Sequence, residues 1–180
     1  MDVEATPISQ LIQNHKRAIS DWPKPGVNFI DILSMLAEHS GDLRAIVSVF
    51  EERCLNLQPD GIIAIDARGF IFAAPLAYAL NLPLLVVRKK GKLPPPTTAV
   101  DYSLEYGTAT LEIAPATLKG KKNLVLVDDI LATGGTAKAV IELCSQYEVQ
   151  ILEAMFVGEV AALAGRAALG EVPAFACAQF

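Results

Sequence analysis

The sequence predicts an α/β fold in which helices flank a mostly parallel central sheet, and two observations support this prediction. Short apolar runs without polar alternation, among them GIIAI, PLLVV and NLVLV, are typical of parallel strands that are buried on both faces. Segments with helical spacing separate these runs. The 180 residues, 52% of them hydrophobic, are enough for one compact core, and no repeat or linker divides them. We therefore expect a single domain over residues 1–180.

The first part of the chain is predicted to be helical. Apolar residues from Ile8 to Ile19 follow helical spacing, and this helix should end at DWPKPGVNF, where two prolines and a glycine prevent its continuation. A second helix is expected from Asp42 to Leu57, because the following QPDG is a turn signal.

Strands and helices then alternate. The run GIIAI precedes the helix-like FIFAAPLAYAL, and NLVLV precedes a helix pattern from about Thr136 to Tyr147. QILEAMFVGEV and VPAFACAQF predict two further strands, on either side of the alanine-rich segment from Ala161 to Leu169.

Residues 91–107 interrupt this alternation. The segment GKLPPPTTAVDYSLEYG contains three consecutive prolines and lacks helix or sheet periodicity over most of its length. A loop longer than about 12 to 15 residues inside a compact domain is usually functional or disordered. We expect this segment to be a flexible lid that carries Tyr102, Glu105 and Tyr106.

Charge and composition exclude several functional classes. A net charge of -5 and a pI near 5.0 argue against a general nucleic-acid or membrane-surface binder. No apolar run approaches the roughly 20 residues of a membrane helix. The three cysteines form no metal-ligand spacing, and the first residues resemble neither a signal peptide nor a transit peptide. We expect a cytoplasmic protein.

Polar residues follow three of the apolar runs, as DARG, as RKKGK, and as DD with ATGGT after it. Ligands of open parallel sheets bind at the carboxyl ends of the strands, so these residues should converge on one crevice.

The ATGGT loop (Ala132–Thr136) has the character of an anion site. Its two glycines let backbone N–H groups turn inward, its threonines add hydroxyl donors, and a helix N-terminus follows. It lacks the lysine of a nucleoside-triphosphate P-loop and the GxGxxG of a dinucleotide fold. Asp128 and Asp129 could accept hydrogen bonds from the vicinal hydroxyls of a sugar phosphate. Alternatively, the two acids only cap a turn and TGGT is a tight connection.

The string VDDILATGGT resembles the phosphoribosyl-pyrophosphate signature of the purine and pyrimidine phosphoribosyltransferases. PKPGVNFIDI, DARGFIF, VVRKKGKLP and YSLEYGTATLEI resemble, in the same order, segments of the adenine phosphoribosyltransferase family. The resemblance implies that family's fold, with a base-binding hood within about residues 1–35 and a lid at about 91–107.

The resemblance also assigns roles around the sugar phosphate. It implies that Asp128 and Asp129 bind the ribose hydroxyls, and that the Asp66–Ala67 peptide is cis in a pyrophosphate-binding turn. Mg²⁺ should be held mainly by the substrate pyrophosphate, without a separate protein site. By analogy, Arg88 reaches across a homodimer interface. The residues implied for the 5′-phosphate are Ala132, Thr133, Gly134, Gly135 and Thr136, and those for pyrophosphate are Asp66, Ala67, Arg68, Arg88 and Lys92.

By the same resemblance, the base lies between Phe29 and Ile130, and backbone groups of Asn28 and Ile30 read its edge. Ile30 departs from the family, which usually has arginine here. Glu105 is implied as the general acid or base, beside the lid residues Tyr102 and Tyr106.

The implied reaction transfers the phosphoribosyl group to adenine, with small-molecule substrates and no nucleic-acid or membrane partner. Two alternatives remain open at this point. One is the same chemistry on another 6-substituted purine, and the other is a non-catalytic sensor of phosphoribosyl pyrophosphate or nucleotides.

Overall fold

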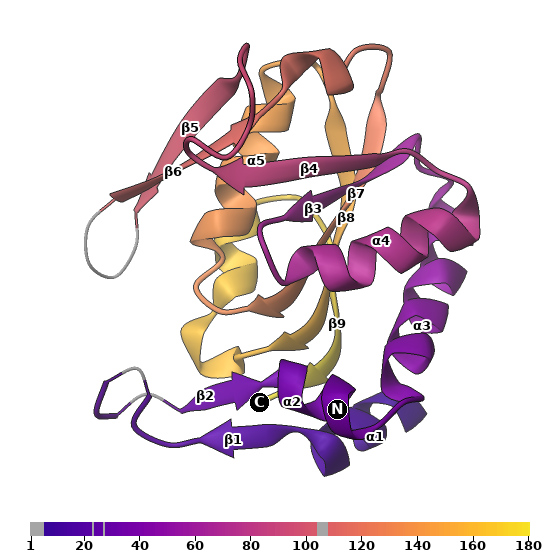
Figure 1. The fold of residues 1–180 in the computed structure, drawn as a ribbon, viewed down its shortest axis with the longest axis vertical. Helices are drawn as coiled ribbons and strands as arrows, with labels where there is room; N and C mark the ends of the chain where they lie inside the picture. The colour runs from indigo at the N-terminus through magenta and orange to yellow at the C-terminus, as the bar shows by residue number, and fades with distance from the viewer. Residues whose placement is uncertain (1–5, 23, 27, 104–107) are drawn as a thin grey trace.

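The computed structural model describes residues 6–22, 24–26, 28–103 and 108–180, and a seven-stranded sheet dominates this part of the chain (Figure 1). The strand order is β5-β6-β4-β3-β7-β8-β9. Neighbouring strands from β4 to β9 pair in parallel, which confirms the predicted fold class. The parallel strands are β4 (Leu84–Lys89), β3 (Gly61–Ile65), β7 (Asn123–Leu131), β8 (Gln150–Glu159) and β9 (Ala174–Gln179).

Helices cover both faces of the sheet, so its central strands are apolar throughout. Along β3, Ile63 and Ile65 belong to one core, whereas Ile62 and Ala64 belong to the other. The first core contains α5 (Gly135–Ser145) and the second contains α3 (Asp42–Leu57) and α4 (Gly69–Leu80). Burial on both faces is the reason that β3 and β7 read as continuous apolar runs.

The predicted helix from Asp42 to Leu57 is confirmed as α3, which ends where Gln58 adopts a left-handed conformation. The alanine-rich segment forms two short 3-10 helices, η2 (Ala161–Leu163) and η3 (Gly165–Leu169), and a third, η1 (Pro115–Thr117), precedes β7. Within the described ranges, no helix has the length and apolar character needed to cross a membrane.

The predicted helix from Ile8 to Ile19 is too long. Helix α1 (Pro7–His15) begins after Thr6, whose hydroxyl accepts the Ser9 N–H, and ends at His15. The chain then forms β1 (Arg17–Ile19), which pairs antiparallel with β2 (Phe29–Asp31). This hood hairpin was missed because its partner strands are short and lie ten residues apart. The helix α2 (Ile32–Glu38) was also missed, although Asp31 caps it by accepting the Ser34 N–H.

The expectation of a loop without sheet structure at residues 91–107 is wrong for part of that range. Strand β5 (Thr98–Ser103) pairs antiparallel with β6 (Thr108–Ile113), and β6 pairs antiparallel with β4. Figure 1 shows this hairpin projecting from one edge of the sheet. Glu105 and Tyr106 lie outside the described residues, whereas Tyr102 lies on β5 and packs against the core.

Candidate active site

Polar residues from neighbouring strands meet at the carboxyl end of the parallel sheet. Strand β3 lies between β4 and β7, so the residues after all three strands are close in space. Arg68, after β3, places Nε 2.6 Å from Oδ2 of Asp129 on β7. Arg88, on β4, places Nε 3.1 Å from Oδ2 of Asp66. The structure therefore brings the three predicted strand ends close together.

The turn after β3 requires close packing. The Asp66–Ala67 peptide is cis, as expected. At Gly69, a Cβ atom would lie 2.7 Å from the Val127 carbonyl oxygen and 3.1 Å from Oδ1 of Asp128. Only glycine therefore allows the start of α4 to approach the end of β7 so closely.

The ATGGT loop connects β7 to α5 in the manner expected of an anion site. Gly134 has a φ of 80° and precedes the first residue of α5. A Cβ atom there would lie 2.3 Å from the Gly165 carbonyl oxygen. Backbone N–H groups at a helix N-terminus have no intrahelical partner and attract anions. A small cavity of about 70 Å³ at this loop is lined by Asp128, Ile130, Leu131, Ala132, Thr133, Gly134, Gly135, Thr136, Ala137 and Phe156.

The two acids of the site are in different environments. Asp129 is 4% exposed and is paired with Arg68. Asp128 accepts the backbone N–H of Asp129 at 2.9 Å through Oδ1. Burial raises the pKa of Asp128 well above its usual value, and the neighbouring carboxylate of Asp129 raises it further. A polyhydroxyl ligand could donate further hydrogen bonds to these two side chains.

A pocket of about 510 Å³ separates the hood hairpin from the ATGGT loop, and we call it the hood pocket. It contains all four residues that the sequence assigned to the base, namely Asn28, Phe29, Ile30 and Ile130. Its other lining residues are Gly26, Arg68, Ala132, Val160, Ala162 and Leu163. A mostly apolar pocket with a few polar groups is typical of a site for a small molecule.

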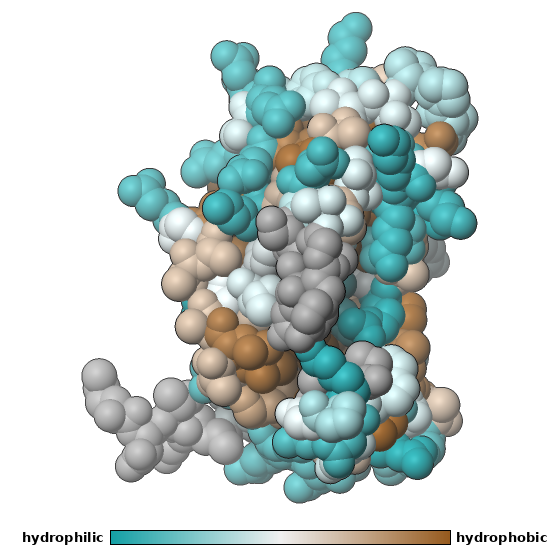
Figure 2. Space-filling model, turned by 90° about the vertical axis from the view of Figure 1, so that its left-hand side faces the viewer, coloured by the Kyte–Doolittle hydropathy of each residue, from teal (hydrophilic) through white to brown (hydrophobic). Residues whose placement is uncertain are grey.

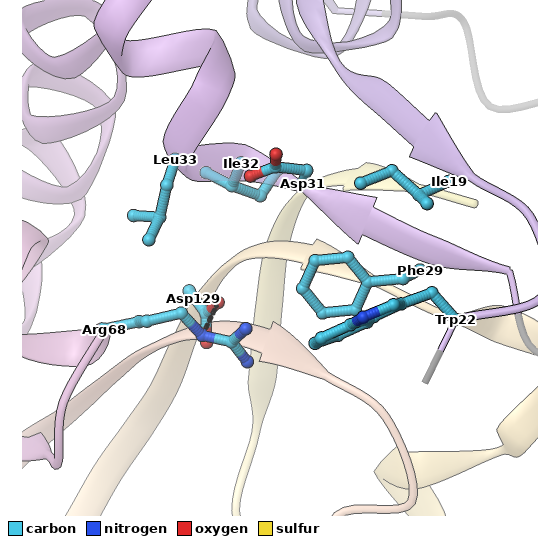
Figure 3. A pocket seen from close by; sticks show the side chains of 8 residues that line it. All are labelled: Ile19, Trp22, Phe29, Asp31, Ile32, Leu33, Arg68 and Asp129. Atoms are coloured by element: carbon cyan, nitrogen blue, oxygen red, sulfur yellow. Dashed lines mark ion pairs between the residues drawn. The ribbon is translucent and has the colours of Figure 1, made fainter. Parts of the chain in front are cut away.

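A second pocket, of about 350 Å³, adjoins the hood pocket at Phe29 and Arg68 (Figure 3). The Trp22 ring meets the Phe29 ring edge to face, with centroids 4.5 Å apart. The Arg68 guanidinium carbon lies 5.7 Å from the Phe29 ring centroid. Figure 3 shows Arg68 and Asp129 on one side of this pocket, facing Phe29 and Trp22. Arg68 thus connects the acids of β7 to the aromatic wall of the hood.

The end of β4 and the turn after it carry two more cations, Arg88 and Lys92, of which Arg88 is paired with Asp66. Nη1 of Arg88 donates to the Lys92 carbonyl oxygen at 3.5 Å, and the guanidinium lies 6.0 Å from the Phe70 ring centroid. In Figure 2, hydrophilic side chains dominate the upper part of the face that carries the β5–β6 hairpin, and hydrophobic ones gather lower down.

Several lining residues were not predicted from the sequence. Trp22 and Gly26 lie in the turn between β1 and β2, and the only hint was that WPKPG adjoins the residues assigned to the base. Val160, Ala162 and Leu163 reach the hood pocket from the end of β8 and from η2. No sequence signal marks them, because the alanine-rich segment has no motif character.

Residues 36–168 match the family model described as a phosphoribosyl transferase domain. The chain is 46% identical over 148 residues to an adenine phosphoribosyltransferase of Carboxydothermus hydrogenoformans, which covers 82% of this chain and 86% of that protein. It is 39% identical over 177 residues to one of Bordetella avium, covering 97% of each.

Solved structures agree with these relatives. The adenine phosphoribosyltransferase of Thermoanaerobacter pseudethanolicus superposes with a TM-score of 0.89 at 36% identity, covering 95% of this chain and 99% of the other. The enzyme of Saccharomyces cerevisiae, solved with an imino-altritol bisphosphate and adenine, gives 0.85 at 33% identity over 94% of this chain and 98% of the other.

Proposed function

This chain belongs to the adenine phosphoribosyltransferase family, and we propose that the crevice described above performs that family's reaction. The chain transfers the 5-phosphoribosyl group from phosphoribosyl pyrophosphate to adenine, forming AMP and pyrophosphate in purine salvage. One observation carries the assignment of the site, namely that its three cavities share lining residues. The hood pocket shares Ile130 and Ala132 with the cavity of the ATGGT loop, which Asp128 also lines. It shares Phe29 and Arg68 with the pocket that Asp129 lines.

The ATGGT loop binds the 5′-phosphate through the N–H groups that open α5, together with the hydroxyls of Thr133 and Thr136. Asp128 and Asp129 accept hydrogen bonds from the ribose 2′- and 3′-hydroxyls. Nε of Arg68 lies 2.6 Å from Oδ2 of Asp129, so the Arg68 guanidinium lies between the ribose and the departing pyrophosphate.

Arg68, Arg88 and Lys92 stabilise the negative charge that develops on pyrophosphate, with the backbone of Asp66 and Ala67 beside them. In the described residues, no group of three His, Cys, Asp or Glu side chains is arranged as a metal site. Mg²⁺ prefers oxygen ligands and commonly binds substrate phosphates with one or two carboxylates, so Asp128 and Asp129 suit an ion that enters with the substrate. The ion would supply further neutralisation of the leaving group.

Adenine binds in the hood pocket, between Phe29 and Ile130, and the backbone groups of Asn28 and Ile30 read its edge. A strand N–H and C=O meet one acceptor and one donor on adenine, whereas hypoxanthine reverses that pattern and would leave buried groups unpaired. Recognition through the backbone explains why Ile30 can replace the arginine that is usual in the family.

Attack at the anomeric carbon passes through a state that resembles an oxocarbenium ion, which water would capture. The lid therefore has to cover the crevice before the bond breaks. We assign Glu105 as the acid or base that manages the purine proton, and Tyr102 and Tyr106 as lid residues.

A homodimer is part of the proposal. Helix α4 presents an apolar stripe of Ile71, Ala74 and Tyr78 that no described part of the chain covers, and Tyr78 is 89% exposed. Such a stripe suits a second copy of the chain. A monomer in sedimentation at micromolar concentration would contradict the dimer. Three buried free thiols suit a reducing compartment, so we also propose a cytoplasmic location.

The assignment is tested by incubating the protein with phosphoribosyl pyrophosphate, Mg²⁺ and one purine at a time. We expect AMP from adenine and little product from hypoxanthine or guanine. Turnover of a 6-oxopurine but not of adenine would move the chain to the other purine specificity. Tight substrate binding without any turnover would favour a sensor.

A further inference from the structure

Strand β6 carries a buried carboxylate in an apolar setting. Glu112 is 5% exposed and stands between Leu111 and Ile113, which are 1% and 0% exposed. It is the cross-strand partner of Arg88 on β4 and of Ala99 on β5. Buried carboxylates are rare unless they are fully hydrogen-bonded, so the partners of Glu112 indicate what it does.

The residues that donate hydrogen bonds to Glu112 lie on the turn that follows β4. Oε1 of Glu112 accepts the backbone N–H groups of Lys92 at 3.0 Å and Leu93 at 3.1 Å. Oε2 accepts the hydroxyl of Thr97 at 3.2 Å. Burial alone would raise the pKa of Glu112, but these donors outweigh it and lower the pKa below its usual value. The carboxylate is therefore ionised and holds both ends of the turn at residues 92–97.

This turn is connected to the crevice through Arg88. The carbonyl oxygen of Lys92 accepts from Nη1 of Arg88, while Nε of Arg88 donates to Asp66 in the turn after β3. Glu112 thus fixes the backbone of Lys92, and that backbone in turn orients Arg88. The side chains of Lys92 and Arg88 are two of the cations that we assign to pyrophosphate binding.

We infer that Glu112 is a positioning residue for the pyrophosphate-binding cations, acting through the Lys92 turn rather than through contact with substrate. This inference rests on the proposed function, because it needs Arg88 and Lys92 to bind pyrophosphate. It also predicts a selective defect. Phosphoribosyl pyrophosphate contains the pyrophosphate group that Arg88 and Lys92 bind, whereas AMP has the same ribose 5-phosphate without pyrophosphate. The binding of phosphoribosyl pyrophosphate should therefore be weakened more than that of AMP.

The test compares the dissociation constants of Mg²⁺–phosphoribosyl pyrophosphate and of AMP by calorimetry. Glu112→Ala removes the acceptor of the Lys92 and Leu93 N–H groups and so releases the turn. We expect it to weaken the binding of phosphoribosyl pyrophosphate about tenfold or more. AMP affinity should stay within about twofold, because the ATGGT loop and hood pocket are untouched. Glu112→Gln should restore most of the affinity, since its carbonyl oxygen can accept from the turn and its amide can donate to Thr97.

Glu153→Ala is the matched control. Glu153 is 6% exposed, ion-paired with Arg53 and on β8, outside the crevice residues. We expect it to lower Tm without changing the ratio of the two dissociation constants. If Glu112→Ala does not fold, Thr97→Val removes a single hydrogen bond and should change the ratio in the same direction by a smaller factor.

A double-mutant cycle identifies the route. Lys92→Ala and Glu112→Ala should be strongly non-additive in phosphoribosyl pyrophosphate affinity, because both remove the same cation from its place. The inference would be overturned if Glu112→Ala weakened both ligands equally or left the ratio of their dissociation constants unchanged. Full additivity of the two substitutions in the affinity for phosphoribosyl pyrophosphate would also overturn it. Failure of the wild-type protein to turn over adenine would instead overturn the proposed function, and the two failures are therefore distinguishable.

Discussion

The ATGGT loop and the hood pocket lie in the same crevice, and they are built in different ways. The loop is five consecutive residues that follow β7 and include the first two residues of α5, and its geometry depends on Gly134 at a φ of 80°. The hood pocket is assembled from the hairpin β1–β2, from Arg68, from Ile130 on β7 and from η2. The part that we assign to the sugar phosphate is thus local in sequence, whereas the part that we assign to the base is distributed.

The ATGGT loop and the hood pocket should therefore differ in how well they tolerate substitution. A phosphate group is recognised by backbone N–H groups whose placement leaves almost no steric freedom. A flat base is enclosed by apolar side chains, and several side chains can form the walls of such a slot. We therefore expect substitutions in the loop to be severe and the departure at Ile30 to be mild.

The largest effect is expected for Gly134→Ala. The new Cβ atom would collide with the Gly165 carbonyl oxygen at 2.3 Å, in a conformation that side chains rarely adopt. We expect kcat/KM to fall by about a thousandfold, because the phosphate donors are displaced. Gly120→Ala is the control, since Gly120 has a φ of 76° and no atom near its Cβ position. It should cost about 1 kcal/mol of stability and leave the rate unchanged. Equal rate losses in both variants would contradict the steric argument.

The next largest effect concerns Glu105, which lies outside the described residues and which we propose as the acid or base of the reaction. Glu105→Ala should lower kcat by about a hundredfold, because it removes proton transfer in the transition state. The KM for phosphoribosyl pyrophosphate should change little. Steady-state kinetics with adenine separate the two constants, and an unchanged kcat would remove Glu105 from the mechanism.

Asp128→Asn should raise the stability of the protein at pH 7 and weaken its binding of substrate. Because the pKa of Asp128 is raised in the folded protein, the unfolded chain loses this proton at a lower pH. Stability therefore falls as the pH rises above the pKa of the unfolded chain, about 4. The asparagine should therefore raise stability at pH 7 by about 1 kcal/mol, with the gain vanishing near pH 4. Phosphoribosyl pyrophosphate should bind about tenfold more weakly.

Asp60 should show the opposite dependence of stability on pH. Its carboxylate accepts the N–H groups of Lys122 and Asn123 at the other end of β7, and hydrogen bonds from these groups lower its pKa. Its contribution to stability is present at neutral pH and is lost as pH falls through the folded value. Asp60→Asn should lower Tm at pH 7 without affecting binding. A lower Tm for Asp128→Asn at pH 7 would contradict the assigned direction.

The smallest effect is expected for Ile30→Arg, which introduces the residue that is usual in the family. If the backbone reads the base, the KM for adenine and the preference over hypoxanthine should change by no more than about twofold. A large gain in kcat or a change in base preference would show that the side chain at this position takes part.

The sequence predicted the fold class and helix α3 because continuous apolar runs and helical spacing are local signals. It failed where pairing is remote or short. Arg17–Ile19 was assigned to a helix, yet it pairs with Phe29–Asp31, and the proline-rich segment concealed β5. Leu163 and Trp22 enter the crevice by tertiary folding alone, so no spacing rule could have found them.

A crystal structure of the protein with AMP would show where the phosphate, the ribose and the base bind. We expect the phosphate to accept hydrogen bonds from the N–H groups of the ATGGT loop and the ribose hydroxyls to donate to Asp128 and Asp129. The adenine ring should lie between Phe29 and Ile130. A phosphate bound away from the ATGGT loop, or a base outside the hood pocket, would contradict the proposed site.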